Sequence, residues 1–337
     1  SFHPTRRVTK AFLCSLILLA DSWSSTVHHD SVFTSCLQCD PWEPSLVTEL
    51  SPSSLAARTS TWSLAATKGA SKYNDDNPSW PMMMKGPHQE EFWEAMRLEL
   101  RTLEDEMDAW ELVRREPWMN VIPSTWAFKI KRFPNGLVKK FKARFCVRGD
   151  RQKEGIDFFE TWSPVAQWST IRVAMVLAAK LNLISVQCDI TAAFIHAKLP
   201  PNEKIFVEQP RGFEYDKANF VLSLKRGQYG LRQAPRLFYR HLSERIVRSG
   251  LQASRLDPCL FFSSELLCIV YVDDILLYGT QKTAIDAFIS KMEKEEVRLR
   301  EEGTAEGFLG VDVQRVGNTV TLTQSGLAKR VVQALGL

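Results

Sequence analysis

Residues 266–278 read Leu-Leu-Cys-Ile-Val-Tyr-Val-Asp-Asp-Ile-Leu-Leu-Tyr, two apolar runs separated by a pair of aspartates. Short apolar runs of this kind are typical of buried β-strands. The stretch therefore predicts a hairpin-like pair of strands with Asp273 and Asp274 between them. Acids embedded in apolar sequence are costly unless a cation or a metal ion compensates them. For the doublet alone, a polar turn without any further role remains an open alternative.

A second apolar run, residues 183–190, carries Asp189 near its end. If adjacent strands place Asp189 beside Asp273, two or three carboxylates share one site, and divalent cations would relieve their repulsion. Oxygen-only ligands select Mg²⁺ or Mn²⁺ over zinc. Two such ions about 4 Å apart can activate an attacking hydroxyl and stabilise the leaving oxygen of a phosphoryl transfer. The sequence therefore predicts an active site at these strands.

Charge is distributed unevenly along the 337 residues, although 43 basic and 39 acidic side chains leave a net charge of only +4. Residues 89–111 carry a net charge of −7, which is typical of a solvated helix face. Residues 118–151 carry +8 and residues 225–248 carry +6. Two cationic segments favour a groove that binds a polyanion. The composition, 45% hydrophobic and 24% charged, excludes collagen-like, low-complexity and wholly disordered chains.

The first cationic segment contains Pro134-Asn135-Gly136 between two runs of alternating apolar and basic residues. Asn-Gly in this position is a strong hairpin signal. We expect a basic two-stranded ribbon that can grip phosphates. The alternative is a solvated edge hairpin that its lysines protect from further strand pairing.

Helical and strand patterns are mixed without regular βαβ repetition, which predicts an α+β fold. Apolar residues at spacings of three and four predict one helix over residues 89–111. A second helix is expected over residues 169–181, with Ser169 or Thr170 as its cap. Further helices are expected around residues 237–247 and over 281–300, with strands at 204–208, 220–224 and 259–262 and a last hairpin at 308–314 and 319–323.

Residues 1–70 show no clear periodicity and are assigned no fold. Their motif Cys36-Leu-Gln-Cys39 is only half of a zinc site, and a metal role for it is a weak hypothesis. The apolar run at residues 11–20 is about half as long as a membrane span, so no transmembrane helix is expected. The 7 scattered cysteines do not form a disulfide framework and indicate a reducing compartment.

Several motifs follow one another in order over about residues 74–337. They are Trp126-Ala-Phe-Lys-Ile-Lys-Arg, Lys142-Ala-Arg-Phe-Cys-Val-Arg-Gly, Gly155-Ile-Asp-Phe-Phe-Glu-Thr-Trp-Ser-Pro-Val, Asp189-Ile-Thr-Ala-Ala-Phe, Tyr229-Gly-Leu-Arg-Gln-Ala-Pro-Arg, Asp257, Tyr271-Val-Asp-Asp-Ile-Leu and Phe308-Leu-Gly-Val. In these motifs the chain resembles the reverse transcriptase of copia-type LTR retrotransposons. The resemblance implies an α+β, right-hand polymerase with fingers at about residues 118–182 and a palm at about 183–324, incomplete at its C-terminus.

The resemblance implies that Asp189 and Asp273 are the metal-binding carboxylates and that Asp274 assists them. The implied cofactors are two Mg²⁺ or Mn²⁺ ions. The implied reaction is attack of a primer 3′-hydroxyl on the α-phosphate of an incoming dNTP, with release of pyrophosphate. Base pairing reads the template in such a reaction, so the protein needs to hold only the backbone.

Other roles are implied for residues outside the carboxylate site, each with a structural alternative. Lys142 and Arg144 would hold the triphosphate. Phe194 would exclude a 2′-hydroxyl, or it is a plain core residue. Arg232 and Gln233 would contact dNTP or template, or they form a helix entry before Pro235. Phe308, Leu309 and Gly310 would hold the primer end, or they form an ordinary β-turn in a packed strand.

The resemblance also implies partners and a location. The partners would be an RNA or DNA template with its primer, dNTPs, and ribonuclease H and integrase domains in a longer polyprotein, without a membrane. The location would be a virus-like particle in the cytoplasm, or the nucleus. Two other functions remain open: an inactive retrotransposon-derived relic that at most binds nucleic acid, and another two-metal palm enzyme such as a cyclase. The motif at residues 229–236 argues against the second.

Overall fold

The computed structural model describes residues 74–335 except 134, 216–218, 304–306, 310 and 318. Its described part divides into two compact units, one formed by residues 96–126 and 144–335 and the other by residues 74–95 and 127–143. The unassigned segment 1–70, the motif Cys36-Leu-Gln-Cys39 and the apolar run at 11–20 lie outside the described residues. Cys146, Cys188, Cys259 and Cys268 are free thiols.

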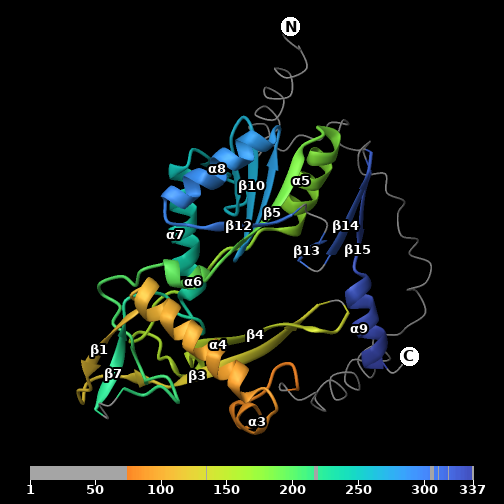
Figure 1. Ribbon diagram of the computed structural model, residues 1–337. Helices are drawn as coiled ribbons and strands as arrows, with labels where there is room; N and C mark the ends of the chain where they lie inside the picture. Colours follow the sequence, from red (N-terminus) through yellow and green to blue (C-terminus); the bar gives the residue numbers. More distant parts are fainter. Residues whose placement is uncertain are drawn as a thin grey trace, which may run out of the picture. The chain divides into compact units, whose positions relative to one another are not determined.

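A six-stranded antiparallel sheet forms the centre of the first unit (Figure 1). The strand order is β12-β5-β11-β10-β9-β8, so the two apolar runs of the sequence are neighbours in the middle of the sheet. The predicted pair of strands around the aspartates is confirmed. The strands are β5 (Ile184–Ile190), β8 (Gln252–Ala253), β9 (Leu260–Phe262), β10 (Leu266–Tyr271), β11 (Asp274–Gly279) and β12 (Leu299–Gly303).

Helices cover both faces of this sheet (Figure 1). Helices α7 (Ala234–Arg248) and α8 (Lys282–Lys294) pack on one face through Leu242, Ile285 and other apolar side chains. Helix α5 (Trp168–Lys180) packs on the other face. Because side chains alternate along a strand, β10 and β11 supply apolar residues to both cores. This burial on both faces explains why their sequences are continuously apolar.

The helix predicted over residues 89–111 is wrong at its C-terminal end. Helix α4 (Gln89–Arg101) continues only as a π-helical turn (Thr102–Glu106), and the chain then forms strand β1 (Trp110–Arg114). Asp108 reverses the chain with a φ of 46°. Trp110 pairs with Leu224 across the strand ladder and contacts the ring of Phe145, so tertiary packing overrides the helical spacing.

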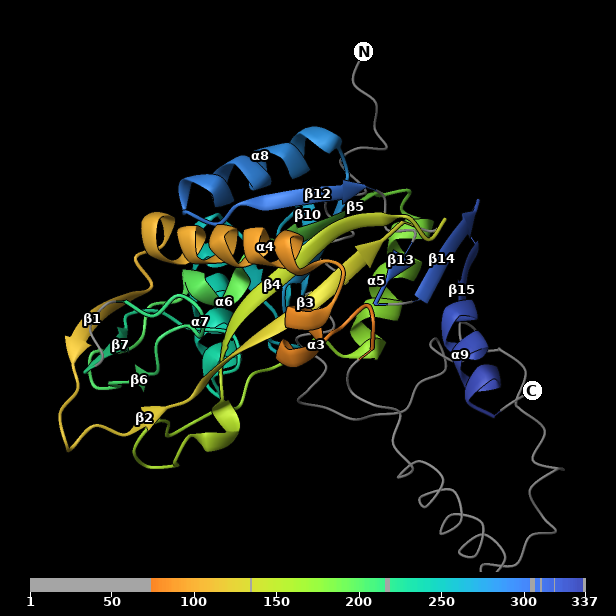
Figure 2. The ribbon, with the colours of Figure 1, turned by 60° about the horizontal axis from the view of Figure 1, so that its bottom comes forward.

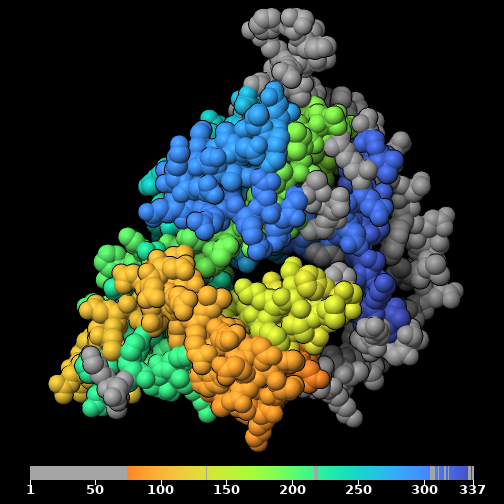
Figure 3. Space-filling view, in the orientation of Figure 1, coloured from red at the N-terminus to blue at the C-terminus, as the bar shows by residue number. Residues whose placement is uncertain are grey.

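Two other helix predictions also need correction. Helix α5 begins at Trp168 with Gln167 as its cap residue, so neither Ser169 nor Thr170 caps it. The helix expected over 281–300 ends at Lys294, and Glu296 turns the chain with a φ of 63°. The chain then returns as β12, an edge strand with mostly exposed side chains that lies with α8 on the blue surface in Figure 3. The charged character of residues 295–303 therefore marks an exposed sheet edge rather than helix.

Two smaller sheets complete the first unit. One has the order β1-β7-β6-β2, with β2 (Val121–Ile122) parallel to β6 (Phe206–Val207) and β7 (Phe220–Leu224) antiparallel to β1 and β6. The other contains the predicted last hairpin, formed by β14 (Val311–Val316) and β15 (Thr319–Thr323), but the strand expected over 308–314 is interrupted, and its first part is a separate strand, β13 (Gly307–Phe308). Helix α9 (Ser325–Leu335) follows. No helix in the described part of the chain is long and apolar enough to cross a membrane.

The second unit is built on the predicted basic hairpin. Strands β3 (Ser124–Arg132) and β4 (Val138–Val147) pair as a two-stranded sheet, and Gly136 turns with a φ of 85°. Helix α3 (Trp80–Lys85) and the first residues of α4 lie against the hairpin (Figure 2). The Phe92 ring lies 5.1 Å from Phe128 and 5.2 Å from Phe141, which joins the helix to both strands. The α+β class is confirmed in both units.

Candidate active site

The structure brings the three predicted carboxylates together at one edge of the central sheet. Strand β5 lies beside β11, and Asp189 stands directly opposite Asp274 in their antiparallel register. The backbone N–H of Ile190 donates a hydrogen bond of 3.0 Å to the carbonyl of Asp273. The three aspartates therefore lie within one turn and the strand end next to it.

The turn that carries Asp273 has a left-handed residue. Val272 has a φ of 57° and stands with Asp273 between the paired residues Tyr271 and Asp274. Two-residue hairpin turns need positive φ, which glycine and asparagine supply at little cost. A β-branched residue is strained in this conformation. The strain is held by the strands on either side, and strain of this kind clusters at functional sites.

The electrostatics of the site are dominated by negative charge. Burial raises the pKa of Asp274 to about 6, and the carboxylates of Asp273, Asp189 and Glu302 act in the same direction. The guanidinium of Arg300 on β12 lies 3.3 Å from Asp189 and 2.7 Å from Glu302. Arg300 pairs with only two of these four carboxylates, which leaves the group with an excess of negative charge.

These residues fit a hard divalent cation by their chemistry. All of the donors are carboxylate oxygens, and an added cation would relieve the repulsion that raises the pKa of Asp274. Within the described residues, no three His, Cys, Asp or Glu side chains already converge as a metal-binding group. The carboxylates would therefore have to turn from their present rotamers, and Asp189 would have to part from Arg300, to bind an ion together.

An arginine and two aromatic rings adjoin the carboxylates. The guanidinium of Arg144 lies over the ring of Tyr229, 4.6 Å from its centroid. The Tyr229 ring lies 5.3 Å from Phe194, which is half-buried on helix α6 (Ala193–His196). Burial raises the pKa of Tyr229 to about 12, and the charge of Asp273 contributes to that rise. Arg144 is thus held by a cation–π contact in the same unit as the aspartates.

The other residues implied by the resemblance lie in several places. Lys142 is a partly buried residue of β4 in the second unit. It stands two residues before Arg144 on the same strand. Phe308 is fully buried in the core under α5, Leu309 follows with a φ of 54°, and Gly310 lies outside the described residues. The structure therefore gives Phe308 a packing role, while a primer-holding role for this segment remains a prediction.

Arg232 and Gln233 precede helix α7 and differ sharply in exposure. Arg232 is exposed, and its Nε donates a 2.8 Å hydrogen bond to the carbonyl of Gly149. Gln233 is only 1% exposed, and its side-chain amide is bonded inside the protein. For Gln233 to contact a nucleotide directly, one of these hydrogen bonds would have to break.

Sequence reasoning placed two buried acids, Asp157 and Asp257, among the matching motifs but gave neither of them a role. The Asp257 carboxylate accepts hydrogen bonds of 2.9 Å from the N–H groups of Gln167 and Cys259. The Asp157 carboxylate accepts from Asn120 at 2.7 Å and from the Lys153 N–H at 2.6 Å. Both acids stand in motifs that matched the family, but no local pattern distinguishes an acid that binds backbone from one that binds a substrate.

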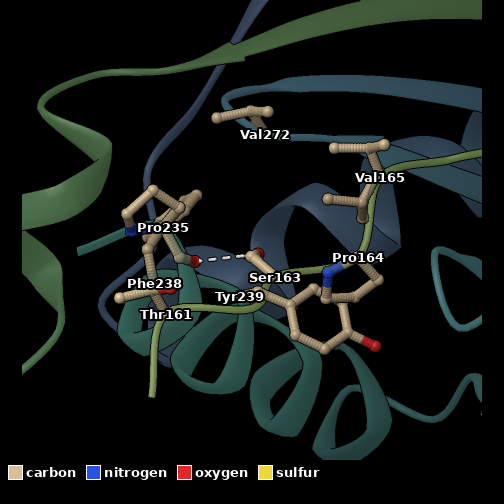
Figure 4. A pocket seen from close by; sticks show the side chains of 9 residues that line it. Thr161, Ser163, Pro164, Val165, Pro235, Phe238, Tyr239 and Val272 are labelled. Atoms are coloured by element: carbon tan, nitrogen blue, oxygen red, sulfur yellow. Dashed lines mark hydrogen bonds between the residues drawn. The ribbon is translucent and has the colours of Figure 1, made fainter. Parts of the chain in front are cut away.

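A cavity of about 240 Å³ lies beside the strained turn (Figure 4). Val272 and Val165 point into it from one side, and Pro235 and Tyr239 of α7 line another side. The hydroxyl of Ser163 donates a 3.2 Å hydrogen bond to the carbonyl of Pro235, which ties the loop at 161–165 to the helix. The turn that carries Asp273 thus adjoins a mainly apolar hollow.

A mixed α/β unit with acids at the turn between its two central strands is the architecture of a palm-type polymerase. Residues 107–337 match the family model described as reverse transcriptase (RNA-dependent DNA polymerase). Because this match covers well over half of the 337 residues, the chain belongs to the reverse transcriptase family.

Within this family, the chain is similar to Pol polyproteins of retrotransposons, which confirms the resemblance to the copia type. It is 30% identical to the Retrovirus-related Pol polyprotein from transposon TNT 1-94 of Nicotiana tabacum, over 76% of this chain and 20% of that protein. It is 30% identical to the polyprotein from transposon RE1 of Arabidopsis thaliana, over 64% of this chain and 15% of that protein. The chain thus spans about a fifth or less of the length of these relatives.

A yeast polyprotein and a solved structure are more distant. The Transposon Ty1-ER2 Gag-Pol polyprotein of Saccharomyces cerevisiae is 26% identical over 52% of this chain and 10% of that protein. A foamy viral protease-reverse transcriptase in complex with double-stranded DNA aligns with a TM-score of 0.35 and 14% identity, over 68% of this chain and 34% of that chain.

Proposed function

We propose that this chain carries out RNA-directed DNA synthesis, transferring a nucleotide from dNTP to a primer 3′-hydroxyl. The observation that carries the proposal is the meeting of Asp189 and Asp274 in register beside Asp273, with the pKa of Asp274 raised to about 6. Clustered carboxylates that repel one another are destabilising unless a cation joins them. Within a reverse transcriptase family member, that cation requirement points to nucleotidyl transfer.

The chain's own residues divide the work of this reaction. Asp189 and Asp273 would hold the divalent ions, and Asp274 would keep the local field negative and favour their binding. When bound, a pair of Mg²⁺ or Mn²⁺ ions supplies Lewis-acid chemistry to the two reacting oxygens of a phosphoryl transfer. The strained turn at Val272 fixes the backbone of Asp273 before substrate arrives, so only the carboxylate side chains have to rearrange.

Substrate binding would fall to cationic and aromatic side chains of the chain. Arg144, held on the Tyr229 ring, and Lys142 would bind the triphosphate through charge-assisted hydrogen bonds. Phe194 presents a half-buried ring and would limit space at the sugar. Exposed Arg232 would contact a phosphate of the dNTP or of the template, with Gln233 beside it.

The partners proposed for the chain follow from the same activity. They are an RNA or DNA template with its primer, and dNTPs. Ribonuclease H and integrase domains are proposed for a longer polyprotein of which this chain would be a part. We propose a virus-like particle in the cytoplasm, or the nucleus, as the place of action.

Primer extension by the purified chain tests the proposal. The assay contains an RNA template, a DNA primer, dNTPs and Mg²⁺ or Mn²⁺, and it compares wild type with Asp273→Asn. We expect incorporation to fall by about a thousandfold or more in Asp273→Asn, because an essential charged donor is lost. Asp286→Asn is the matched control, since Asp286 is an exposed acid of α8 paired with Lys282.

The control variant should extend primers at the wild-type rate. If neither wild type nor control extends primers, while wild type still binds RNA–DNA duplex, the chain is an inactive relic that retains nucleic-acid binding. If Asp273→Asn extends as well as wild type, the assignment of the carboxylate site is wrong.

A further inference from the structure

Three polar side chains are buried together behind the segment that precedes α7. Gln152 is 7% exposed, Asp157 2% and Gln233 1%. Buried polar groups are costly unless they are hydrogen-bonded, and a fully satisfied network gives a single rigid arrangement. This group lies outside the carboxylate site, so its position needs another explanation.

The amide of Gln233 is committed to this network. Its Nε2 donates to the carbonyl of Asp157 at 2.8 Å and to a Glu203 carboxylate oxygen at 3.2 Å. Its Oε1 accepts from the Nε2 of Gln152 at 3.0 Å. A primary amide has two N–H donors, so both donors of Gln233 are used within the protein.

Gln152 connects this network to Arg232. Its Oε1 accepts the backbone N–H of Arg232 at 2.8 Å, while its Nε2 serves Gln233. Two contacts fix the Arg232 side chain. Its Nε donates a hydrogen bond to the carbonyl of Gly149, and its guanidinium lies 5.4 Å from the centre of the Phe158 ring. The far end of Arg232 remains exposed.

The backbone leaves little room for this arrangement to shift. A Cβ on Gly149 would lie 2.0 Å from the carbonyl oxygen of Gly230, and a Cβ on Gly230 would lie 2.1 Å from that of Val147. Gly230 also has a φ of 92°, which favours glycine. The segments at 147–152 and 229–233 are thus in direct backbone contact and behave as one body.

We propose that Gln152 is a positioning residue that aims Arg232 at a phosphate oxygen of the bound nucleotide or template backbone. The inference rests on the proposed polymerase function. Gln152 touches no substrate; it fixes the backbone of Arg232 on one side and the amide of Gln233 on the other. A guanidinium held in place before binding loses less rotamer entropy when it binds an anion.

Substitution of Gln152 tests the inference through the dNTP KM and the Kd for template–primer. In Gln152→Leu both hydrogen bonds are lost, and we expect KM or Kd to rise by about tenfold with a smaller change in kcat. An effect on KM alone assigns the phosphate to dNTP, and an effect on Kd alone assigns it to the template. Gln152→Glu keeps an acceptor for the Arg232 N–H but loses the donor to Gln233, so it separates the two hydrogen bonds.

Gln209→Leu is the matched control, because Gln209 also donates to a backbone carbonyl (Phe220, 2.8 Å) and accepts a backbone N–H (Tyr215, 2.6 Å), away from Arg232. It should lower Tm as Gln152→Leu does, without changing KM or Kd. A second arm repeats Gln152→Leu in an Arg232→Ala background, where it should have no further effect on binding. Independent, multiplying effects of the two substitutions would overturn the inference, as would unchanged KM and Kd in both Gln152 variants.

Failure of the polymerase proposal is distinguishable from failure of this one. If wild type does not extend primers, the Kd arm still reports whether Gln152 acts through Arg232 on a phosphate backbone, and a duplex affinity that does not depend on either residue overturns the inference. If wild type extends primers but the Gln152 variants match it, the polymerase function stands and the positioning role fails.

Discussion

Two sets of aspartates in the first unit differ in what surrounds them. Asp157 and Asp257 are each 2% exposed, and each carboxylate accepts a hydrogen bond from a backbone N–H. In the contacts described, neither of them faces another carboxylate. Asp189, Asp273 and Asp274 are more exposed, yet they face one another and Glu302. The more deeply buried set is the better satisfied one.

Burial alone therefore does not identify a functional acid. A carboxylate that accepts hydrogen bonds from backbone N–H groups is compensated within the folded chain, and its charge stabilises the fold. Carboxylates that repel one another are not compensated within the chain, and the stability that this repulsion costs is a reason to expect a ligand. The following substitutions test this distinction on stability.

The largest effect on stability is expected for the buried aspartates that accept backbone N–H groups. Asp257→Ala leaves the N–H groups of Gln167 and Cys259 without their acceptor, and Gln167 caps α5. We expect the free energy of unfolding to fall by about 3 kcal/mol, measured by urea denaturation. Asp257→Asn, which keeps one acceptor oxygen, should lose less. A loss below about 0.5 kcal/mol for Asp257→Ala would contradict the structural role.

Removing a carboxylate from the group of Asp189, Asp273 and Asp274 is expected to raise the free energy of unfolding rather than lower it. Burial and the neighbouring carboxylates raise the pKa of Asp274 from 3.8 to about 6 in the folded chain, so wild type loses stability as pH rises from about 4 to 6 and stays less stable above. Because Asp274 is half-buried and partly screened, this loss is about 1 kcal/mol. With EDTA present, Asp274→Asn should therefore unfold at higher urea than wild type at pH 8, and at equal urea at pH 4. Equal stability at both pH values would show that the repulsion is negligible.

The smallest effect is expected at the turn. Val272→Asn relieves a positive φ that a β-branched residue tolerates poorly, and we expect the unfolding free energy to rise by about 0.5 kcal/mol. Val316→Asn is the control, because Val316 is an exposed strand residue outside the positive-φ group described, and it should gain nothing. A gain in both variants would mean that replacing a valine with asparagine, rather than relieving strain, is the cause.

Much of the fold could be predicted because its signals are local. The Asn135-Gly136 turn, the apolar strands at 184–190 and 266–279, and the last hairpin all depend on alternation and turn residues within one short stretch. The predictions failed where distant contacts decide. Trp110 has helical spacing, but its partners are Leu224 and Phe145. The end of α8 at Lys294 likewise depends on an available edge beside β5.

The site shows the same division. Asp189 and Asp273 could be found because acids inside apolar strands are conspicuous in a sequence. Arg300 and Glu302 could not, since Arg300 ended a predicted amphipathic helix and Glu302 followed it, and both reach the site only through the pairing of β12 with β5. Gln152 gives no sequence signal at all, because an amide has no charge and its role depends on partners 80 and 81 residues away.

The contact between Gly149 and Gly230 has a consequence for how this protein can vary. Neither position can accept a side chain, since a Cβ on Gly149 would overlap the carbonyl oxygen of Gly230 and a Cβ on Gly230 would overlap that of Val147. A compensating substitution at the partner position cannot restore the lost space, because glycine is already the smallest residue. A single substitution is therefore not tolerated at either glycine, whereas the exposed residues of the edge strand β12 can be substituted one at a time. At this pair the constraint comes from two backbones that touch, rather than from a side chain that does chemistry.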